Sequence, residues 1–360
     1  MTMRQKTRCL VGAFLSLLLA SCATGRPSTA GEPQARAAAP SAPAGSLVYV
    51  SNEDTADISL IDTATDTVVG TVFVGKRPRG LRLSRDGRTL YVAVSGSPKA
   101  PPGMDESALP PPDRAADGIS VIDVAARKLL RTLPAGQDPE SFDLSADDRF
   151  LYVSNEDAGT ASIVDASTGE ILSAVPVGGE PEGVTTSPDG RFVYVTSEEE
   201  NQVSVLDTAS RRVVARLETG PRPRSVVFTP DGAKAYVTGE QGSVVTAVDA
   251  RAHRVLGQIS IPSPGAKPMG STVSADGKSV FISNGRGGSV SIIDVATDRV
   301  RRTVEGVGTR PWGIGLAAGG RKLYTANGPS NDVTVIDPTS GEILKRIPVG
   351  GSPWGIAPSR

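Results

Sequence analysis

The sequence predicts an all-β fold, a seven-bladed β-propeller of four-stranded antiparallel blades, because two markers recur along it with one period. The first is the proline of a Gly-x-x-Pro turn, at Pro78, Pro139, Pro181, Pro223, Pro268, Pro311 and Pro353. The second is an aspartate that ends a strand-like segment, at Asp62, Asp123, Asp165, Asp207, Asp249, Asp294 and Asp337. Successive markers are mostly 42 to 45 residues apart, and this spacing with short strands is typical of propeller blades.

One repeat shows the four strands of a blade, which we name A to D in chain order. Short β-branched or aromatic segments at 184–187, 192–196, 203–207 and 212–217 are separated by turn residues. The first two are joined by Ser-Pro-Asp-Gly, whose glycine accepts a positive φ at little cost. No part of the chain after its N-terminal leader has a convincing 3.6-residue apolar period, so we expect no helices in the ring.

The two chain ends are predicted to share one blade. The ring begins at residues 47–50 with a B strand that no A strand precedes. It ends at residues 354–357 with an A strand that no B strand follows. Pairing of these strands closes the ring and covers sheet edges that would otherwise be open to aggregation.

The N-terminus has the features of an export signal. Residues 1–21 combine three basic residues with an apolar segment too short to span a membrane. Leu-Ala-Ser-Cys at 19–22 matches the bacterial lipobox, and this resemblance implies that Cys22 carries lipid after the leader is removed. An ordinary signal peptide is the alternative. Residues 22–46 are rich in Ala, Pro, Ser and Gly and are interpreted as a flexible tether.

These features predict a bacterial envelope lipoprotein whose propeller occupies residues 47–360. Ala23, which follows the lipobox cysteine, favours the outer membrane by its resemblance to enterobacterial sorting signals, with the protein facing the periplasm or the surface. The formal net charge is −1, so no basic field indicates nucleic acid. The ring is expected to be a monomer attached to the membrane through the Cys22 lipid.

A proline-rich insertion interrupts the period in the second blade. It lies within residues 95–118, between strands B and C, and its many prolines exclude a strand. A solvated surface loop is one interpretation. A lid or partner-binding loop is the other, since long loops on rigid scaffolds often carry function.

A candidate binding site is expected at the end of the ring where the D–A and B–C loops emerge, which we call the mouth. The residue that directly follows each turn proline varies among the blades. In order round the ring these residues are Trp354, Arg79, Glu140, Glu182, Arg224, Met269 and Trp312. Arginine pairs with carboxylate or phosphate, and tryptophan offers a stacking face. The mouth therefore suits a small ligand with aromatic or apolar and ionised parts, or an envelope protein. Alternatively, Arg and Glu pair across blades and the tryptophans plug the channel.

Three other groups of polar residues are expected to have no chemical role. Acidic residues of the B–C loops, at 52–54, 155–157 and 198–201, match no calcium-binding pattern and are interpreted as solvated loop charge. The seven repeated aspartates are expected to accept backbone N–H bonds in turns. His253, the only histidine, is placed in a solvated turn at the opposite end, which disfavours catalytic zinc or copper.

The repeats resemble those of the YVTN-repeat β-propellers. Tyr-Val-Ser-Asn at 152–155, Val-Ser-Val-Leu-Asp at 203–207 and Pro-Asp-Gly-Arg at 188–191 carry this resemblance, which covers residues 47–358. The chain also resembles, more narrowly, exported propellers associated with pyrroloquinoline quinone (PQQ)-dependent catabolism. The segments that carry this resemblance, in the same order as in that subgroup, are 76–80, 138–140, 152–157, 180–183, 222–224, 327–332 and 353–355. That resemblance implies an accessory role near periplasmic alcohol oxidation. The insertion and the lipobox depart from the subgroup.

The sequence favours a binding or scaffolding protein that is not an enzyme and holds no cofactor or metal. Two tryptophans are too few for the docking motifs of PQQ-containing dehydrogenases, and no haem-attachment or phosphate-cradle motif occurs. The alternative function is a hydrolase of the lactonase type, in which Glu140 and Glu182 serve as general acid and base if their pKa values differ.

Overall fold

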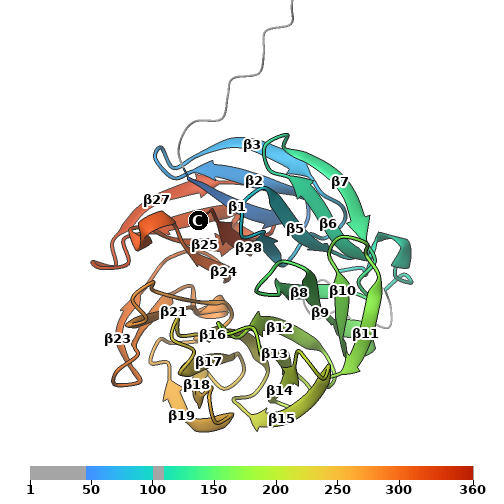
Figure 1. Cartoon of the computed structure of the whole chain (residues 1–360). Coiled ribbons are helices and arrows are strands. Elements are labelled where there is room, and N and C mark those ends of the chain that lie inside the picture. The colour runs from blue at the N-terminus through green and yellow to red at the C-terminus, as the bar shows by residue number, and fades with distance from the viewer. Residues whose placement is uncertain (1–45, 100–108, 360) are drawn as a thin grey trace, which may run out of the picture. The chain divides into compact units, whose positions relative to one another are not determined.

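Seven four-stranded antiparallel sheets lie round a central axis, as Figure 1 shows, which confirms the predicted fold class. The structure, a computed structural model, describes residues 46–99 and 109–359. The predicted signal peptide, Cys22 and the tether up to residue 45 lie outside the described residues. Within the described part, no helix is both long enough and apolar enough to cross a membrane.

The blades are numbered from the N-terminus, and each has its innermost strand first. Blade 1 contains β28 (Pro353–Pro358), β1 (Leu47–Asn52), β2 (Asp57–Asp62) and β3 (Thr67–Phe73). Blade 2 contains β4 (Leu81–Leu83), β5 (Thr89–Val94), β6 (Gly118–Asp123) and β7 (Lys128–Leu133). Blade 3 contains β8 (Pro139–Leu144), β9 (Phe150–Asn155), β10 (Thr160–Asp165) and β11 (Ile171–Pro176). Blade 4 contains β12 (Pro181–Thr186), β13 (Phe192–Ser197), β14 (Gln202–Asp207) and β15 (Arg212–Glu218).

The remaining blades repeat this arrangement. Blade 5 contains β16 (Pro223–Phe228), β17 (Lys234–Gly239), β18 (Val244–Asp249) and β19 (Arg254–Ser260). Blade 6 contains β20 (Ser271–Val273), β21 (Ser279–Ser283), β22 (Val290–Asp294) and β23 (Arg299–Val304). Blade 7 contains β24 (Pro311–Leu316), β25 (Leu323–Asn327), β26 (Asp332–Ile336) and β27 (Ile343–Pro348). Single 3₁₀ turns occur at Arg114–Ala116, Glu156–Ala158, Gly285–Gly287, Ala318–Gly320 and Gly328–Ser330.

The ring closes as predicted, because the last strand pairs with the first. β28 runs antiparallel to β1, with Tyr49 opposite Ala357 and Val50 opposite Ile356. The backbone N–H of Ser359 donates to the carbonyl of Leu47 at 2.7 Å. The two ends of the chain thus complete one sheet, and blade 1 has no vacant position beside its first strand.

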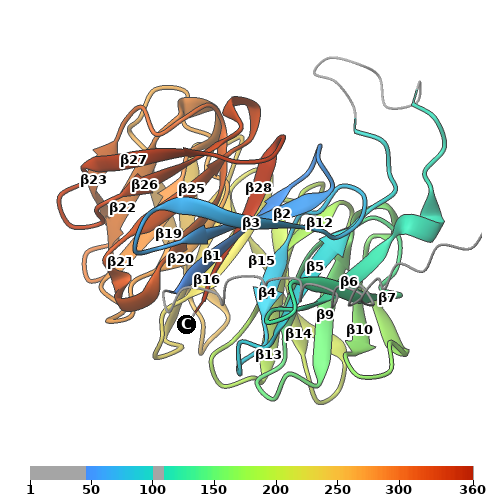
Figure 2. The ribbon, with the colours of Figure 1, turned by 90° about the horizontal axis from the view of Figure 1, so that it is seen from above.

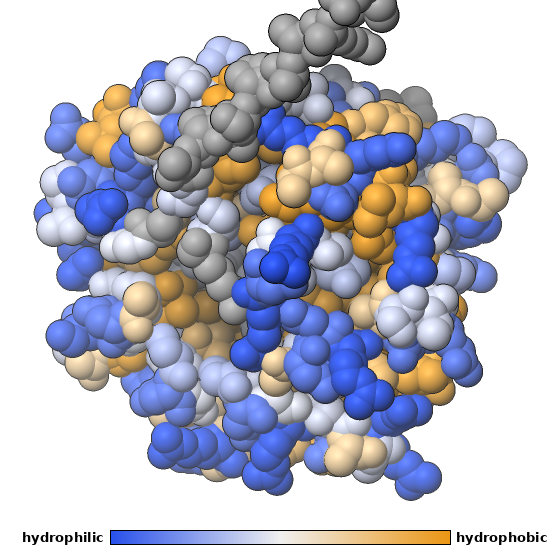
Figure 3. Space-filling view, turned by 45° about the horizontal axis from the view of Figure 1, so that its top comes forward, coloured by the Kyte–Doolittle hydropathy of each residue, from blue (hydrophilic) through white to orange (hydrophobic). Residues whose placement is uncertain are grey.

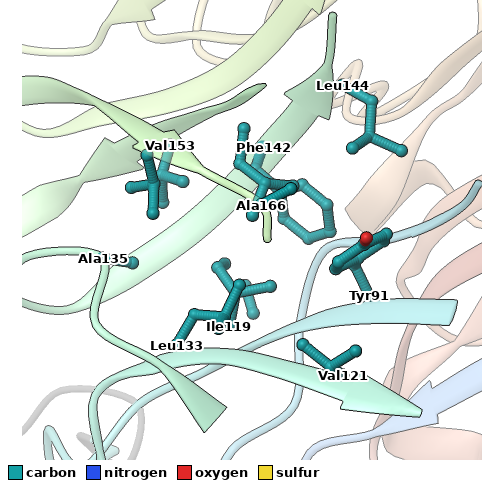
Figure 4. Close-up of a cluster of buried hydrophobic side chains, with 12 residues drawn as sticks. Tyr91, Ile119, Val121, Leu133, Ala135, Phe142, Leu144, Val153 and Ala166 are labelled. Carbon is teal, nitrogen blue, oxygen red and sulfur yellow. The ribbon is translucent and has the colours of Figure 1, made fainter. Parts of the chain in front are cut away.

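The hydrophobic core lies between neighbouring blades, and Figure 4 shows one of its clusters. Tyr91 and Val121 of blade 2 pack with Phe142, Leu144 and the other buried residues of blade 3. Phe142 is fully buried, so its truncation to alanine is expected to cost about 3–5 kcal/mol. Each blade therefore stabilises its neighbour, as in other repeat architectures.

The outer strands carry most of the exposed apolar side chains. Phe73 of β3 and Leu130 of β7 are the most exposed, at 65% and 59%. Hydrophilic side chains cover most of the face in Figure 3, and apolar areas lie between them. Single exposed apolar residues of this kind are ordinary on a protein surface.

The described parts of the insertion, 95–99 and 109–117, contain no strand, as predicted. In Figure 2 they project away from the sheets. Lys99 contacts Glu53 of blade 1 at 2.8 Å, and Arg114 contacts Asp157 of blade 3 at 2.5 Å. The two ends of the insertion are therefore held by the loops of the blades on either side.

The end of the ring opposite the mouth consists of structural turns. The carboxylate of Asp165 accepts backbone N–H bonds from Ser167 and Thr168, both at 2.9 Å, which confirms the role predicted for the repeated aspartates. His253 lies in a turn, as predicted, but its side chain is less solvated than expected. Its ring is half-buried, lies 4.4 Å from the ring of Phe192 and hydrogen-bonds Tyr194 at 2.8 Å, since the tyrosines of the B strands extend toward the turns of the next blade.

Candidate functional site

The residues after the turn prolines meet at the mouth, where the inner strands surround a cavity of about 100 Å³. Five of the seven predicted site residues line this cavity, namely Glu182, Arg224, Met269, Trp312 and Trp354. The other two, Arg79 and Glu140, are buried just behind the lining residues Gly80 and Ser141. The structure therefore brings the predicted set together.

Hydroxyl groups of the Tyr-Val-Ser-Asn strands fix the backbone of these residues. Each hydroxyl donates to the carbonyl of the mouth residue in the following blade. The pairs are Ser51 with Arg79 at 2.6 Å, Ser154 with Glu182 at 2.6 Å, Thr238 with Met269 at 2.7 Å and Ser283 with Trp312 at 2.5 Å. The repeated motif thus joins neighbouring blades at the site.

Close contact between inner strands requires glycine next to several mouth residues. A Cβ atom on Gly183 would lie 2.5 Å from the carbonyl oxygen of Arg224. A Cβ atom on Gly313 would lie 2.5 Å from the carbonyl oxygen of Trp354. Real Cβ atoms do not approach backbone this closely, so only glycine lets the strands converge here.

Arg79 is the centre of a buried charge cluster formed by blades 2 and 3. Its guanidinium, in a residue only 1% exposed, contacts the carboxylates of Asp138 and Glu140 and lies 3.4 Å from Glu156. Burial raises the pKa of Glu140 to about 7, although Arg79 opposes the rise. Within the described residues, Oε2 of Glu140 has no hydrogen-bond partner. This carboxyl therefore changes its charge near neutral pH.

Arg224 is the centre of a second cluster, formed by blades 4 and 5. Its Nη1 contacts Glu182 and Glu198, and its Nε donates to Glu240 at 2.9 Å. Arg222 contacts Glu198 at 2.5 Å and Glu240 at 3.6 Å. The cluster thus has three carboxyl groups and two guanidinium groups, and Glu182 is the carboxyl that contacts only one of them.

Glu182 is the carboxyl of this cluster best placed to hold a proton. Burial raises its pKa well above the ordinary value, Arg224 opposes the rise, and the neighbouring carboxylate of Glu198 adds to it. Both causes disfavour the charged form. Because Glu182 also lines the cavity, a proton held there faces any bound ligand.

The aromatic half of the mouth consists of Trp312 and Trp354. Their ring centroids are 5.5 Å apart at an interplanar angle of 38°. The guanidinium carbon of Arg224 lies 5.5 Å from the centroid of Trp312, and that of Arg310 lies 4.8 Å from it. Trp312 therefore connects the charged half of the mouth to the aromatic half through cation–π contacts.

The structure shows that mouth Arg and Glu residues pair across adjacent blades, one of the two arrangements considered from the sequence. The interpretation of the B–C loop acids as solvated is wrong for Glu53 and Glu198, which are buried against Arg77 and Arg224. The sequence analysis also missed Asp138, Glu240 and Arg310. Their positions in the repeat could have indicated them, because Asp138 and Arg310 each precede a turn proline and Glu240 begins a B–C loop. No metal-binding cluster occurs among the described residues.

Different parts of the ring are similar to two propeller families. Residues 113–235 match the family described as YNCE-like β-propeller, and residues 208–348 match the family described as lactonase, 7-bladed β-propeller.

Two curated proteins are similar to about a third of the chain. Antigen Lp49 of Leptospira interrogans is 30% identical over 142 residues, which is 31% of either chain. The seven-bladed β-propeller protein Rv1057 of Mycobacterium tuberculosis is 32% identical over 111 residues, 31% of this chain and 24% of that protein. The matched region thus spans a third or less of each relative.

Solved structures extend the likeness to the whole ring. A chain of Kuenenia stuttgartiensis hydrazine synthase superimposes with a TM-score of 0.68 at 22% identity, covering 85% of this chain and 99% of that one. The periplasmic gluconolactonase of Pseudomonas aeruginosa gives 0.70 at 22% identity, with 88% and 99% covered. A putative 6-phosphogluconolactonase of Bacteroides uniformis gives 0.72 at 17%, with 87% and 99% covered. At these identities the likeness shows the fold.

The prediction that the protein is not an enzyme is contradicted by the lactonase family match over residues 208–348. That prediction relied on the place of His253 away from the mouth and on the absence of haem-attachment and phosphate-cradle motifs. A buried carboxyl with a raised pKa is itself a possible acid–base group. The chain is a seven-bladed β-propeller, parts of which are similar in sequence to YNCE-like and lactonase-type propellers.

Proposed function

We propose that the protein is a hydrolase of the lactonase type that opens a cyclic ester in the mouth cavity. The observation that carries this proposal is that Glu182 and Arg224, an acid–base group and a guanidinium in contact, line one cavity together with the two tryptophans. The match to the lactonase family supports the same reaction class. A raised pKa of a buried carboxyl at a cavity is typical of acid–base sites, and burial raises the pKa of Glu182 in this way.

Arg224 is suited to polarise the lactone carbonyl. Its Nε and Nη1 contact carboxylates, whereas its Nη2 has no hydrogen-bond partner in the described part of the chain. A guanidinium N–H directed at the carbonyl oxygen stabilises the negative charge that develops there as water attacks. The contact with Trp312 holds the guanidinium in place.

Glu182 is suited to move the proton. In its ionised form the carboxylate accepts a proton from the attacking water while the oxygen of that water bonds to the carbonyl carbon. The tetrahedral intermediate then collapses, the bond from carbon to the ring oxygen breaks, and the Glu182 carboxyl returns the proton to that oxygen. The product is a hydroxy acid, and Glu182 is ionised again.

The size of the cavity limits the substrate. A space of about 100 Å³ is somewhat smaller than the 150 Å³ apolar cavity that accepts benzene in another protein. A five- or six-membered lactone ring is of the right scale, with its substituents outside at the mouth. Trp312 and Trp354 would contact the face of that ring.

The direct test is lactone opening by purified protein, followed as acid release from glucono-δ-lactone above the spontaneous rate. We expect Glu182→Gln to lose at least about 100-fold in rate, the typical contribution of a general acid–base group. Glu342→Gln, an exposed carboxyl in the turn between β26 and β27, is the matched control and should keep the wild-type rate. Wild-type protein that opens no aldonolactone, or a Glu182→Gln variant as fast as wild type, would refute the proposal.

We further propose that this hydrolase is an exported lipoprotein of the cell envelope, related to the PQQ-associated propellers that its repeats resemble. Oxidation of a cyclic sugar hemiacetal yields a lactone, so a lactone-opening enzyme would consume the product of such an oxidation. Labelling of the full chain with radioactive palmitate tests the anchor. Incorporation into wild type but not into Cys22→Ser is the expected result, and equal labelling of both would contradict it.

A further inference from the structure

Basic side chains on the mouth loops of blades 1 to 5 are neutralised by carboxylates. They are Lys76, Arg77, Arg79, Lys99, Arg114, Arg222 and Arg224. Each lies within 4 Å of at least one carboxylate oxygen. This complete pairing leaves no cation on that side of the described mouth available to a ligand without breaking an ion pair.

The basic side chains on the mouth loops of blades 6 and 7 have no such partners. Lys267 precedes the turn proline of blade 6, Arg286 lies in the B–C loop of the same blade, and Arg310 precedes the turn proline of blade 7. None of the three lies within 4 Å of a carboxylate oxygen of the described residues. Glu305, in the same loop as Arg310, accepts a hydrogen bond from Ser263 at 3.0 Å.

Arg310 is held in a defined position although it has no ion-pair partner. Its backbone has a left-handed φ of 52°, and its guanidinium lies over the ring of Trp312. The residue is half-buried. A positioned, partly desolvated guanidinium can bind an anion with less loss of side-chain entropy than a mobile surface arginine.

The electrostatic surroundings of Arg310 are those of a site that lacks its counter-charge. Burial lowers the pKa of Arg310, and Glu240 opposes this effect. The like charges of Arg224 and Arg286 lower the pKa further. An anion placed between Arg286 and Arg310 would relieve this repulsion.

We infer that Lys267, Arg286 and Arg310 form an anion-binding site beside the cavity, which selects ligands that carry a carboxylate or phosphate group. The inference rests on the proposed function for the identity of the ligand, which would be a lactone with an acidic substituent. The ring would enter the cavity against Trp312 and Trp354, and the acidic group would contact the three cations. Arginine and lysine together accept either oxyanion.

A small ligand fits this site better than a polyanion such as a nucleic acid. The mouth loops of blades 3 and 4 carry carboxylates, among them Glu156, Asp157, Glu180, Glu199 and Glu200, and no basic residue. A polyanion that crossed the mouth would meet these charges, whereas a compact anion can stay on blades 6 and 7. The acidic side therefore limits the size of the anion that binds.

The two tryptophans give a direct readout, because they are the only ones in the chain and both lie at the site. The full-length protein is titrated with 6-phosphogluconate, gluconate, inorganic phosphate and uncharged glucitol while tryptophan fluorescence is recorded. We expect a saturable change with the anions and none with glucitol. The two organic anions distinguish a phosphate from a carboxylate as the preferred group.

Substitutions of single basic residues test which side chains bind the anion. Arg310→Gln should weaken binding of the preferred anion by about tenfold or more, the loss expected for one charge-assisted contact, and Arg286→Gln should weaken it less. Lys76→Gln removes the same charge from a paired, exposed position of the same rim and should bind like wild type. Because Arg310 lies over Trp312, its substitution can change the fluorescence itself, so the affinities are also measured by calorimetry. Equal affinity of Arg310→Gln and wild type, or equal weakening in Lys76→Gln, would overturn the inference.

The outcomes separate this inference from the proposed reaction. Glu182→Gln should still bind the anions although it no longer opens lactones. Anion binding by a protein that opens no lactone would refute the reaction and keep the site. Lactone opening that is equally fast for neutral and acidic lactones and is unchanged in Arg310→Gln would refute the site and keep the reaction.

Discussion

The two halves of the mouth differ in how their charges are satisfied. On blades 2 to 5, Arg79 and Arg224 are buried and each contacts several carboxylates. On blades 6 and 7, Arg310 is half-buried and lies on an indole ring without a carboxylate within 4 Å in the described structure. The charges of the first half are satisfied within the protein, and burial raises the pKa of two of its carboxyls, Glu140 and Glu182. The second half is complete only when a ligand supplies the missing charge.

Loss of Arg224 should have the largest effect, because it leaves Glu182, Glu198 and Glu240 buried together without their shared cation. We expect Arg224→Met to destabilise the protein by about 3–5 kcal/mol, the usual cost of removing one partner from a buried ion pair. Urea unfolding at neutral pH measures this. A loss below about 1 kcal/mol would show that water already screens the cluster.

The pH dependence of stability should reveal the proton on Glu140. Its folded-state pKa of about 7 lies above the value of 4.5 for an unfolded chain, so its contribution is fully present below pH 4.5 and is lost as pH rises through 7. The difference amounts to about 3 kcal/mol. Glu140→Gln stays neutral at every pH and should flatten this part of the curve. Parallel stability curves for wild type and variant between pH 4.5 and 8 would contradict the assignment.

The hydroxyl that joins blades 3 and 4 should have an intermediate effect. Ser154→Ala removes the bond to the carbonyl of Glu182 and leaves buried backbone groups without a partner, which costs about 1–3 kcal/mol. Thermal unfolding measures the loss. Ser340→Ala, at an exposed turn, is the control and should change the melting temperature little.

Arg310→Gln should have the smallest effect on stability, because no ion pair is broken. We expect a change within about 0.5 kcal/mol of wild type, as for surface substitutions. Urea unfolding beside Arg224→Met makes the contrast between the two halves direct. A cost as large as that of Arg224→Met would mean that Arg310 is structural and that the two halves do not differ.

The fold could be predicted from the sequence because the turn prolines and strand aspartates repeat the same local structure seven times. The seven mouth residues could be placed together because each occupies the same position of its repeat. The sequence offered pairing of the mouth charges across blades as one of two arrangements but could not decide between them. Whether Glu198 is solvated or buried against Arg224 depends on how closely adjacent blades approach, and that distance is set by contacts such as Gly183 against the Arg224 backbone.

Motifs could not decide for the proposed reaction class, which the sequence offered only as the alternative function, and the reason is physical. Acid–base chemistry by Glu182 depends on a pKa that burial and Glu198 raise, and neither cause is visible in a string of residues. The unpaired state of Arg310 is equally a property of the assembled mouth, because Arg222 occupies the same position before its proline and is paired. Equivalent positions in a repeat thus acquire different chemistry from their neighbours.

The pH dependence of lactone opening tests the central claim most directly. If Glu182 takes the proton from water, the rate for wild type rises with pH as that carboxyl ionises, with a midpoint well above the ordinary value for glutamate. Glu198→Gln removes the charge that raises this pKa, so its midpoint should move to lower pH, while Glu182→Gln should show neither the rise nor the rate. A profile that is the same in all three proteins would contradict the account.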